Sequence, residues 1–315
     1  MQNLAKALRP GDTIGIIAPA SPPRSDERIE KSVRYFEKLG YRVVLGKHLQ
    51  NGRGYLSAPD KDRVSDLYSM FRAKNVKAIF YHRGGYGSIR LLDKIDYDLI
   101  RQNPKIIVGY SDATALFAAI YKKAGFKSCF FGPMPGVDLW DEIDLFTEEN
   151  LWRALTSTKP FGELPITNSH SLRRRGQGGD PIVGRIIGGN LTVFASLLGT
   201  SYQPSFKSTI PFFEEIDEKP RKIDAYFAQL HLAGLFANSK AILLGQFTNC
   251  TDTDAPTLTL DEVFDDYFSK LKIPVIQNLP FGHEKAMWTI PFGAKIRIES
   301  GGEKAKISVV ENVLI

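Results

Sequence analysis

The first 125 residues alternate apolar β-forming runs with amphipathic helical segments, and this alternation constrains the fold most. Residues 25–39 and 61–74 place apolar side chains, such as Ile29, Val33 and Phe36, at helical spacing. Strand-like runs lie between and beside the helices, at residues 13–18, 41–45, 76–81 and 105–109. Strands separated by helices predict βαβ units and a parallel sheet, in which an active site lies beyond the carboxyl ends of the strands.

The second half of the chain changes character after a segment rich in Gly, Pro, Ser and charge. That segment, residues 156–181, is expected to be a linker or a mobile loop. Strands are expected at 185–187, 209–216, 241–247 and between 286 and 315, and helices at 188–198, 220–234 and 259–271. We therefore expect an N-terminal α/β domain at 1–155 and a second β/α domain with more antiparallel character at 182–315.

Composition excludes several classes of partner. The net charge of +6 is mild, and the basic run Arg173-Arg174-Arg175 lacks interleaved aromatics, so a solvated loop is expected and no nucleic-acid partner. No apolar run approaches the length of a membrane-spanning helix, so no membrane partner is expected. The N-terminal apolar run is too short for a signal peptide. With Cys129 and Cys250 expected as buried free thiols, the protein is expected to be cytoplasmic.

Ser111 stands where an apolar strand ends and a helix begins at once, in the stretch KIIVGYSDATALFAAI. One interpretation is a helix cap, because serine is a favoured N-cap residue and Asp112 suits the helix dipole. The other is a nucleophile elbow, in which a tight turn presents the hydroxyl at the top of a sheet.

The sequence Gly84-Gly85-Tyr86-Gly87 follows another predicted strand. It lacks both the dinucleotide-binding fingerprint and the Walker lysine. A tight turn, a phosphate cradle and a set of backbone N–H donors for an oxyanion remain open.

A serine nucleophile needs a base and a carboxylate that orients it. Among five histidines, His82 beside the glycine run and His283 in a turn are the candidates; the others are His48, His170 and His231. Glu214 and Glu215 end an apolar strand, so one of them faces inward and needs a partner. HExxH and other metal-ligand spacings are absent from the sequence, which predicts neither a metal nor another cofactor.

Six stretches occur in order along nearly the whole chain: GDTIGIIAPAS, RGGYG, GYSDAT, IIGGNL, FFEEIDEKPRKID and PFGH. This set resembles the LD-carboxypeptidase family, serine peptidases that trim murein tetrapeptides. The resemblance implies a flavodoxin-like or amidotransferase-like N-terminal α/β domain and a smaller, swivelling C-terminal β/α domain. It also implies a homodimer. The stretch 170–184 looks longer and more basic than is usual for the family before GGNL. The identity of the substrate is therefore expected to depend on this stretch.

The resemblance also implies the site residues. Ser111 would be the nucleophile, His283 the general base and Glu214 the orienting acid, with Glu215 as the fallback. The N–H groups of Gly85 and Asp112 would form the oxyanion hole, without a metal.

The expected substrate is a small murein peptide that loses a C-terminal D-amino acid, D-alanine, during peptidoglycan recycling. A basic group must meet its carboxylate, and Arg83 is the candidate. Two alternatives stay open: a microcin-immunity-like hydrolase of aminoacyl or peptidyl nucleotide amides, and a non-catalytic two-lobed binding protein.

Overall fold

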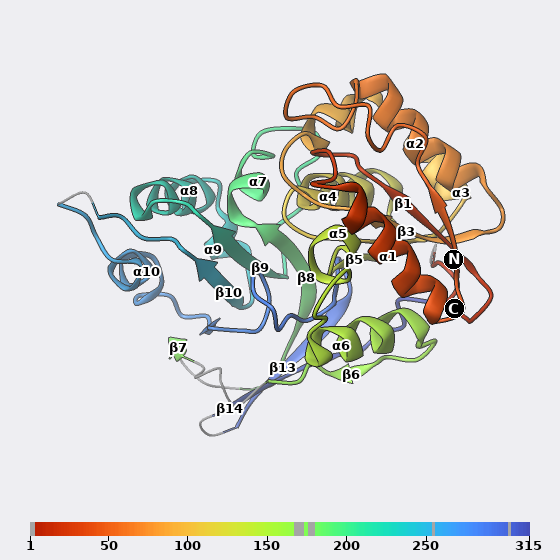
Figure 1. The fold of residues 1–315 in the computed structure, drawn as a ribbon. Helices are drawn as coiled ribbons and strands as arrows, with labels where there is room; N and C mark the ends of the chain where they lie inside the picture. The colour runs from red at the N-terminus through yellow and green to blue at the C-terminus, as the bar shows by residue number, and fades with distance from the viewer. Residues whose placement is uncertain (1–3, 167–172, 176–179, 254–255, 302–303) are drawn as a thin grey trace. The chain divides into compact units, whose positions relative to one another are not determined.

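The computed structural model describes residues 4–166, 173–175, 180–253, 256–301 and 304–315 (Figure 1). The chain divides into two compact units. The first unit comprises Met1–Pro160, Lys285–Phe292 and Asn312–Ile315, and the second comprises Phe161–Glu284 and Gly293–Glu311.

The first unit is built on a mainly parallel sheet. Its described strands are β1 (Thr13–Ile17), β2 (Arg42–Leu45), β3 (Val76–Tyr81), β4 (Ile106–Gly109), β5 (Cys129–Phe131) and β12 (Ile290–Pro291). They lie in the order β12-β5-β4-β3-β1-β2, and only β12 pairs antiparallel among them. The parallel order 2-1-3-4-5 is that of flavodoxin-like folds, which confirms the predicted fold class.

Helices alternate with the strands of the first unit, and the first two of them confirm the helices predicted at 25–39 and 61–74. They are α1 (Asp26–Lys38), α2 (Asp60–Arg72), the 3₁₀ helix η1 (Ser88–Lys94), α3 (Tyr97–Gln102), α4 (Ala113–Ala124), α5 (Pro135–Asp138) and α6 (Leu145–Thr156). The Ser25 side chain caps α1, which buries Ile29 and Phe36. Helix α4 ends at Gly125, whose left-handed backbone (φ 65°) is a common helix stop.

The second unit has a mixed sheet. Its described strands are β6 (Gly162–Glu163), β7 (Arg173–Arg175), β8 (Ile182–Asn190), β9 (Thr209–Ile216), β10 (Ile242–Thr248), β11 (Val275–Gln277), β13 (Lys295–Gly301) and β14 (Lys304–Val309). The order is β6-β14-β13-β8-β9-β10-β11-β7, with β8 to β11 parallel and the flanking strands antiparallel. This bears out the antiparallel character expected of the second half.

Helices of the second unit pack through aromatic side chains. They are α7 (Leu191–Ala195), α8 (Pro220–Leu232), α9 (Leu235–Asn238) and α10 (Leu260–Phe268). Helices α8 and α10 lie beside β9 and β10, with aromatic rings in contact between them (Figure 1). The ring of Phe227 on α8 contacts those of Phe213, Phe264 and Phe268, so one buried phenylalanine joins the sheet to a second helix.

Three sequence expectations differ from the structure. The boundary of 182–315 is too simple, because Lys285–Phe292 and Asn312–Ile315 return to the first unit, where β12 pairs with β5. The segment 156–181 is not all linker or loop, since β6 pairs with β14 and the basic run Arg173–Arg175 pairs with β11.

The third difference lies at Gly188-Gly189-Asn190, where a helix was expected to open. Strand β8 continues to Asn190, which then caps the short helix α7. A Cβ on Gly188 would lie 2.8 Å from the Phe212 backbone nitrogen. Glycine is therefore needed because β8 and β9 approach closely here.

Cys129 and Cys250 are buried free thiols, as predicted. Burial raises the pKa of Cys250 to about 12, so this thiol stays protonated near neutral pH. Across the described residues, every helix is too short or too polar to cross a membrane.

Candidate active site

Ser111 lies in the turn between β4 and α4 with a left-handed backbone (φ 60°). This region is uncommon for residues other than glycine, and strain of this kind is typical of a nucleophile elbow. The simple cap interpretation does not hold, because the N-cap residue of α4 is Asp112 and its side chain makes no capping hydrogen bond. The turn therefore serves a purpose other than starting the helix.

The glycine run lies directly against Ser111. A Cβ on Gly84 would be 3.0 Å from Ser111 Cβ and 3.2 Å from its Oγ. Gly85 has φ 112°, and a Cβ there would lie 2.7 Å from Ser21 Cβ. The Tyr86 N–H donates to Ser21 Oγ over 3.2 Å. Glycine at 84 thus lets the loop backbone reach the turn at Ser111, and glycine at 85 lets it pass close to Ser21. A backbone this close to the serine can supply an oxyanion donor.

The carboxylate of Asp112 ties these two segments together. Its Oδ1 accepts the Gly87 N–H at 3.0 Å and its Oδ2 accepts the Ser88 N–H at 2.9 Å. The side chain is buried, and burial raises the pKa of this carboxyl. Sequence reasoning gave Asp112 a backbone and helix-dipole role only, and no local pattern marks a side chain that bonds residues far away in the sequence.

Glu214 and His283 form a hydrogen-bonded pair in the second unit. Glu214 Oε2 lies 2.7 Å from His283 Nδ1, and the Glu214 side chain is 0% exposed whereas that of His283 is 16% exposed. Gly282 has φ 123°, and a Cβ there would lie 3.0 Å from Glu214 Cβ. Glycine therefore allows the turn that carries His283 to approach Glu214. A buried carboxylate on Nδ1 directs the other ring nitrogen, Nε2, to act as the base.

Glu215 has a different set of partners. Its Oε1 accepts from Asn190 Nδ2 at 2.7 Å and Ile216 N at 3.0 Å. Its Oε2 accepts from the Thr192 backbone N–H at 2.9 Å and the Thr192 hydroxyl at 2.6 Å. Glu215 therefore fastens β9 to the start of α7, and Glu214 is the acid that contacts the histidine.

The remaining histidines have other environments. His82 is buried, and desolvation together with the charge of Arg83 lowers its pKa to about 4, so it stays neutral. His48 Nδ1 pairs with Asp66 at 2.8 Å. His231 lies on α8 with its ring against Phe236, and His170 lies outside the described residues.

The site components are distributed between the units. Ser111, the glycine run and Asp112 belong to the first unit, and the Glu214–His283 pair belongs to the second. In the part of the chain that the structure describes, His, Cys, Asp and Glu side chains form no cluster of three or more suited to a metal ion.

Comparison with known proteins identifies relatives over nearly the whole chain. Residues 14–132 match the LD-carboxypeptidase N-terminal domain, and residues 183–298 match the LD-carboxypeptidase C-terminal domain. A probable murein peptide carboxypeptidase of Bacillus subtilis is 36% identical over 96% of this chain and 93% of its own length.

Solved structures agree with this. The microcin immunity protein MccF, in complex with glutamyl sulfamoyl guanosine, has a TM-score of 0.88 at 28% identity and covers 99% of both chains. A muramoyltetrapeptide carboxypeptidase from Oxalobacter formigenes has a TM-score of 0.82 at 26% identity, covering 95% of this chain and 99% of its own.

Proposed function

Because the chain belongs to the LD-carboxypeptidase family, and is thus a serine-type peptide hydrolase, we propose that it trims murein tetrapeptides in peptidoglycan recycling. The bond cleaved joins an L-centre to a C-terminal D-residue, and D-alanine is released. The left-handed turn at Ser111, with the glycine run packed against it, carries this proposal. Family membership also argues against one of the two alternatives, a non-catalytic two-lobed binding protein.

In the proposed mechanism, Ser111 Oγ attacks the carbonyl carbon of the scissile bond while His283 Nε2 takes the hydroxyl proton. Glu214 holds the imidazole through Nδ1 and stabilises the imidazolium that forms. His283 then donates the proton to the nitrogen of the leaving D-amino acid, which departs as the acyl-enzyme forms. Water, deprotonated by His283, hydrolyses the ester and regenerates Ser111.

The N–H groups of Gly85 and Asp112 are the proposed oxyanion hole. Within the described residues, neither group donates a hydrogen bond to another residue. Asp112 stands at the start of α4, where the helix dipole favours negative charge. Both donors therefore suit an oxygen that becomes negative in the transition state.

Arg83 is proposed to bind the terminal carboxylate of the substrate. The guanidinium is half-buried and donates to the Pro22 carbonyl over 3.3 Å, and no carboxylate among the described residues pairs with it. Burial lowers the pKa of Arg83, and the nearby charges of Arg24 and Arg28 lower it further. Such a group of like charges, next in sequence to the glycine run, favours an anionic ligand.

The test is release of D-alanine from L-Ala-γ-D-Glu-meso-diaminopimelate-D-Ala by the wild-type protein, Ser111→Ala and a sample treated with a chelator. We expect release that survives the chelator and is lost in Ser111→Ala. Release by Ser111→Ala at the wild-type rate would refute the serine mechanism, and no release by the wild type would refute the substrate.

A second candidate substrate is an aminoacyl or peptidyl nucleotide amide. The likeness to MccF bound to glutamyl sulfamoyl guanosine supports it, since that likeness extends over 99% of the chain. Stretch 170–184, at which the sequence pattern departs from the family, lies partly outside the described residues. Turnover of glutamyl sulfamoyl guanosine faster than that of the murein peptide would favour this substrate.

We further propose a homodimer, which rests on the family resemblance alone, and a cytoplasmic location, which the buried free thiols Cys129 and Cys250 support. Light scattering on the purified protein would give the mass: about twice the 35.2 kDa of one chain supports the dimer, and 35.2 kDa contradicts it.

A further inference from the structure

Arg63 is a buried arginine on α2 whose guanidinium binds backbone carbonyls from two other loops. The residue is 2% exposed. Its Nη1 donates to the carbonyls of Pro19 and Gly87, the second at 2.9 Å, and its Nη2 donates to Asp60 Oδ1 at 2.6 Å. A buried cation is costly unless it is fully paired, so such an arrangement calls for an explanation beyond stability.

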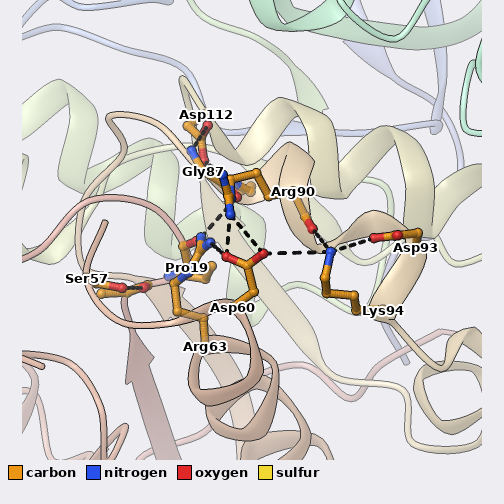
Figure 2. Close-up of polar contacts among 11 residues, drawn as sticks. Pro19, Ser57, Asp60, Arg63, Gly87, Arg90, Asp93, Lys94 and Asp112 are labelled. Atoms are coloured by element: carbon orange, nitrogen blue, oxygen red, sulfur yellow. Dashed lines mark hydrogen bonds and ion pairs between the residues drawn. The ribbon is translucent and has the colours of Figure 1, made fainter. Parts of the chain in front are cut away.

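The peptide of Gly87 is held from both sides. Its carbonyl accepts from Arg63 Nη1 at 2.9 Å and from the Arg90 N–H at 3.2 Å, while its N–H donates to the carboxylate of Asp112 at 3.0 Å. Figure 2 shows these residues as one connected cluster. Gly87 has φ 134°, and a Cβ there would lie 2.7 Å from Arg63 Nη1, so glycine is what allows the guanidinium so close.

The carboxylate of Asp60 holds the Nη2 end of the Arg63 guanidinium. Asp60, at the start of α2, binds Arg63 and also Arg90 Nε at 3.2 Å and Lys94 Nζ at 3.7 Å (Figure 2). Arg90 and Lys94 lie on η1, which follows the glycine run directly. The side chain of Arg63 is thus fixed against a helix that flanks the same loop.

Arg63 therefore joins two loops directly, and the Gly87 N–H links them to a third; all three lie at the carboxyl ends of neighbouring strands. Pro19 follows β1, Gly87 follows β3, and Asp112 follows β4 next to Ser111. In a parallel sheet these ends are where a site is assembled. Small displacements of a donor at such a site cost large factors in rate.

We propose that Arg63 is a positioning residue that fixes the backbone of the Gly84–Gly87 run, and with it the Gly85 N–H, relative to Ser111. This rests on the proposed function, because Gly85 matters only if an oxyanion forms at Ser111. Arg63 touches neither substrate nor the reacting atoms. It acts through the Gly87 peptide and Asp112.

The test variant is Arg63→Lys, which keeps the charge but replaces a planar fork by a single ammonium that cannot reach the same three acceptors in the same geometry. We expect kcat to fall about tenfold to a hundredfold with KM nearly unchanged. Affinity for a peptide boronate, whose tetrahedral adduct occupies the oxyanion hole, should fall by the same factor as kcat. Affinity for the tripeptide product should not change, which a merely structural role does not predict.

Hydrogen exchange of residues 83–89 tests, without any substrate, whether Arg63 fixes the backbone of the Gly84–Gly87 run. We expect the Gly87 and Ser88 amides to exchange at least about tenfold faster in Arg63→Lys. Asp60→Asn, which leaves the guanidinium in place without its anionic anchor, should have a smaller effect in the same direction. If Arg63→Lys does not fold, hydrogen exchange and kcat of Asp60→Asn test the proposal in its place. Arg90→Gln is the matched control, because the Arg90 side chain contacts the same Asp60 carboxylate but not Gly87. The Arg90 backbone N–H donates to the Gly87 carbonyl at 3.2 Å, and the substitution leaves that bond in place.

The proposal is overturned if the Gly87 and Ser88 amides exchange at the wild-type rate in the folded variants. It is also overturned if the kcat of Arg63→Lys equals that of Arg90→Gln. If boronate affinity falls but the amides do not exchange faster, then loss of the fixed backbone at Gly84–Gly87 is not the cause of the fall. If the wild-type protein hydrolyses neither candidate substrate, the proposed function fails, while exchange still shows whether Arg63 holds the loop.

Discussion

Replacing Glu214 by glutamine is expected to remove activity without unfolding the protein. The side chain keeps its shape, and the amide oxygen can still accept from His283 Nδ1. What is lost is a negative charge 2.7 Å from the imidazole, in a position with no solvent exposure. The charges of an imidazolium and a carboxylate are delocalised, so in such a contact they are centred about 4 Å apart and attract by about 4 kcal/mol with an effective dielectric constant near 20. We therefore expect kcat to fall about 10³–10⁴-fold.

The adjacent Glu215 provides a matched variant with the opposite expectation. Each of its two carboxylate oxygens accepts two hydrogen bonds. Whichever oxygen becomes an NH₂ group in Glu215→Gln, it faces a backbone N–H, that of Ile216 or that of Thr192, to which it cannot bond. Loss of those bonds should lower the free energy of unfolding by about 2–4 kcal/mol. The kcat of the folded fraction should stay within about tenfold of wild type.

The assays are D-alanine release at saturating peptide, corrected for folded fraction, and urea denaturation of both variants. Glu214→Gln should change the free energy of unfolding by no more than about 1 kcal/mol. The reasoning fails if Glu215→Gln loses activity more than Glu214→Gln does, because Glu215 would then be the acid that serves the histidine.

Three further outcomes are expected. Gly84→Ala should lower kcat at least about tenfold with little change in melting temperature, because its Cβ would press on Ser111 from 3.0 Å; activity equal to wild type would show that the contact is unimportant. Gly282→Ala should lower both stability, by about 1–2 kcal/mol from its φ of 123°, and kcat, since the Cβ would displace Glu214. Lowering the pH from 7 to 4 should cost about 3 kcal/mol of unfolding free energy through His82, because its folded pKa of about 4 lies below that of the unfolded chain, which binds the proton first. His82→Gln should remove that part of the pH dependence, and an unchanged denaturation profile would contradict this.

The first half of the fold could be read from the sequence because parallel strands and their crossover helices carry strong, distinct periodicities. The strand at Val76–Tyr81 was predicted with its observed bounds. Short strands without such a pattern were missed. β12 is two residues long and contains a proline, and nothing local indicates that it returns to the edge of the first sheet.

The places of some candidate site residues in the fold could be predicted from local order along the chain. Ser111 could be placed at its corner because a strand, a turn and a helix follow one another directly. Arg63 could not be found, because helical periodicity marks Val64 and Leu67 as buried but says nothing of a guanidinium whose acceptors are carbonyls. A residue that acts through backbone groups distant in sequence produces no residue spacing from which its role could be predicted.

The central claim is that Ser111 of the first unit is activated by the Glu214–His283 pair of the second. It is tested most directly by the rate at which a fluorophosphonate labels Ser111, located by mass spectrometry, in wild type and His283→Ala. We predict labelling at Ser111 alone in wild type, and labelling at least about a hundredfold slower in His283→Ala. Equal rates in the two proteins would contradict a shared triad.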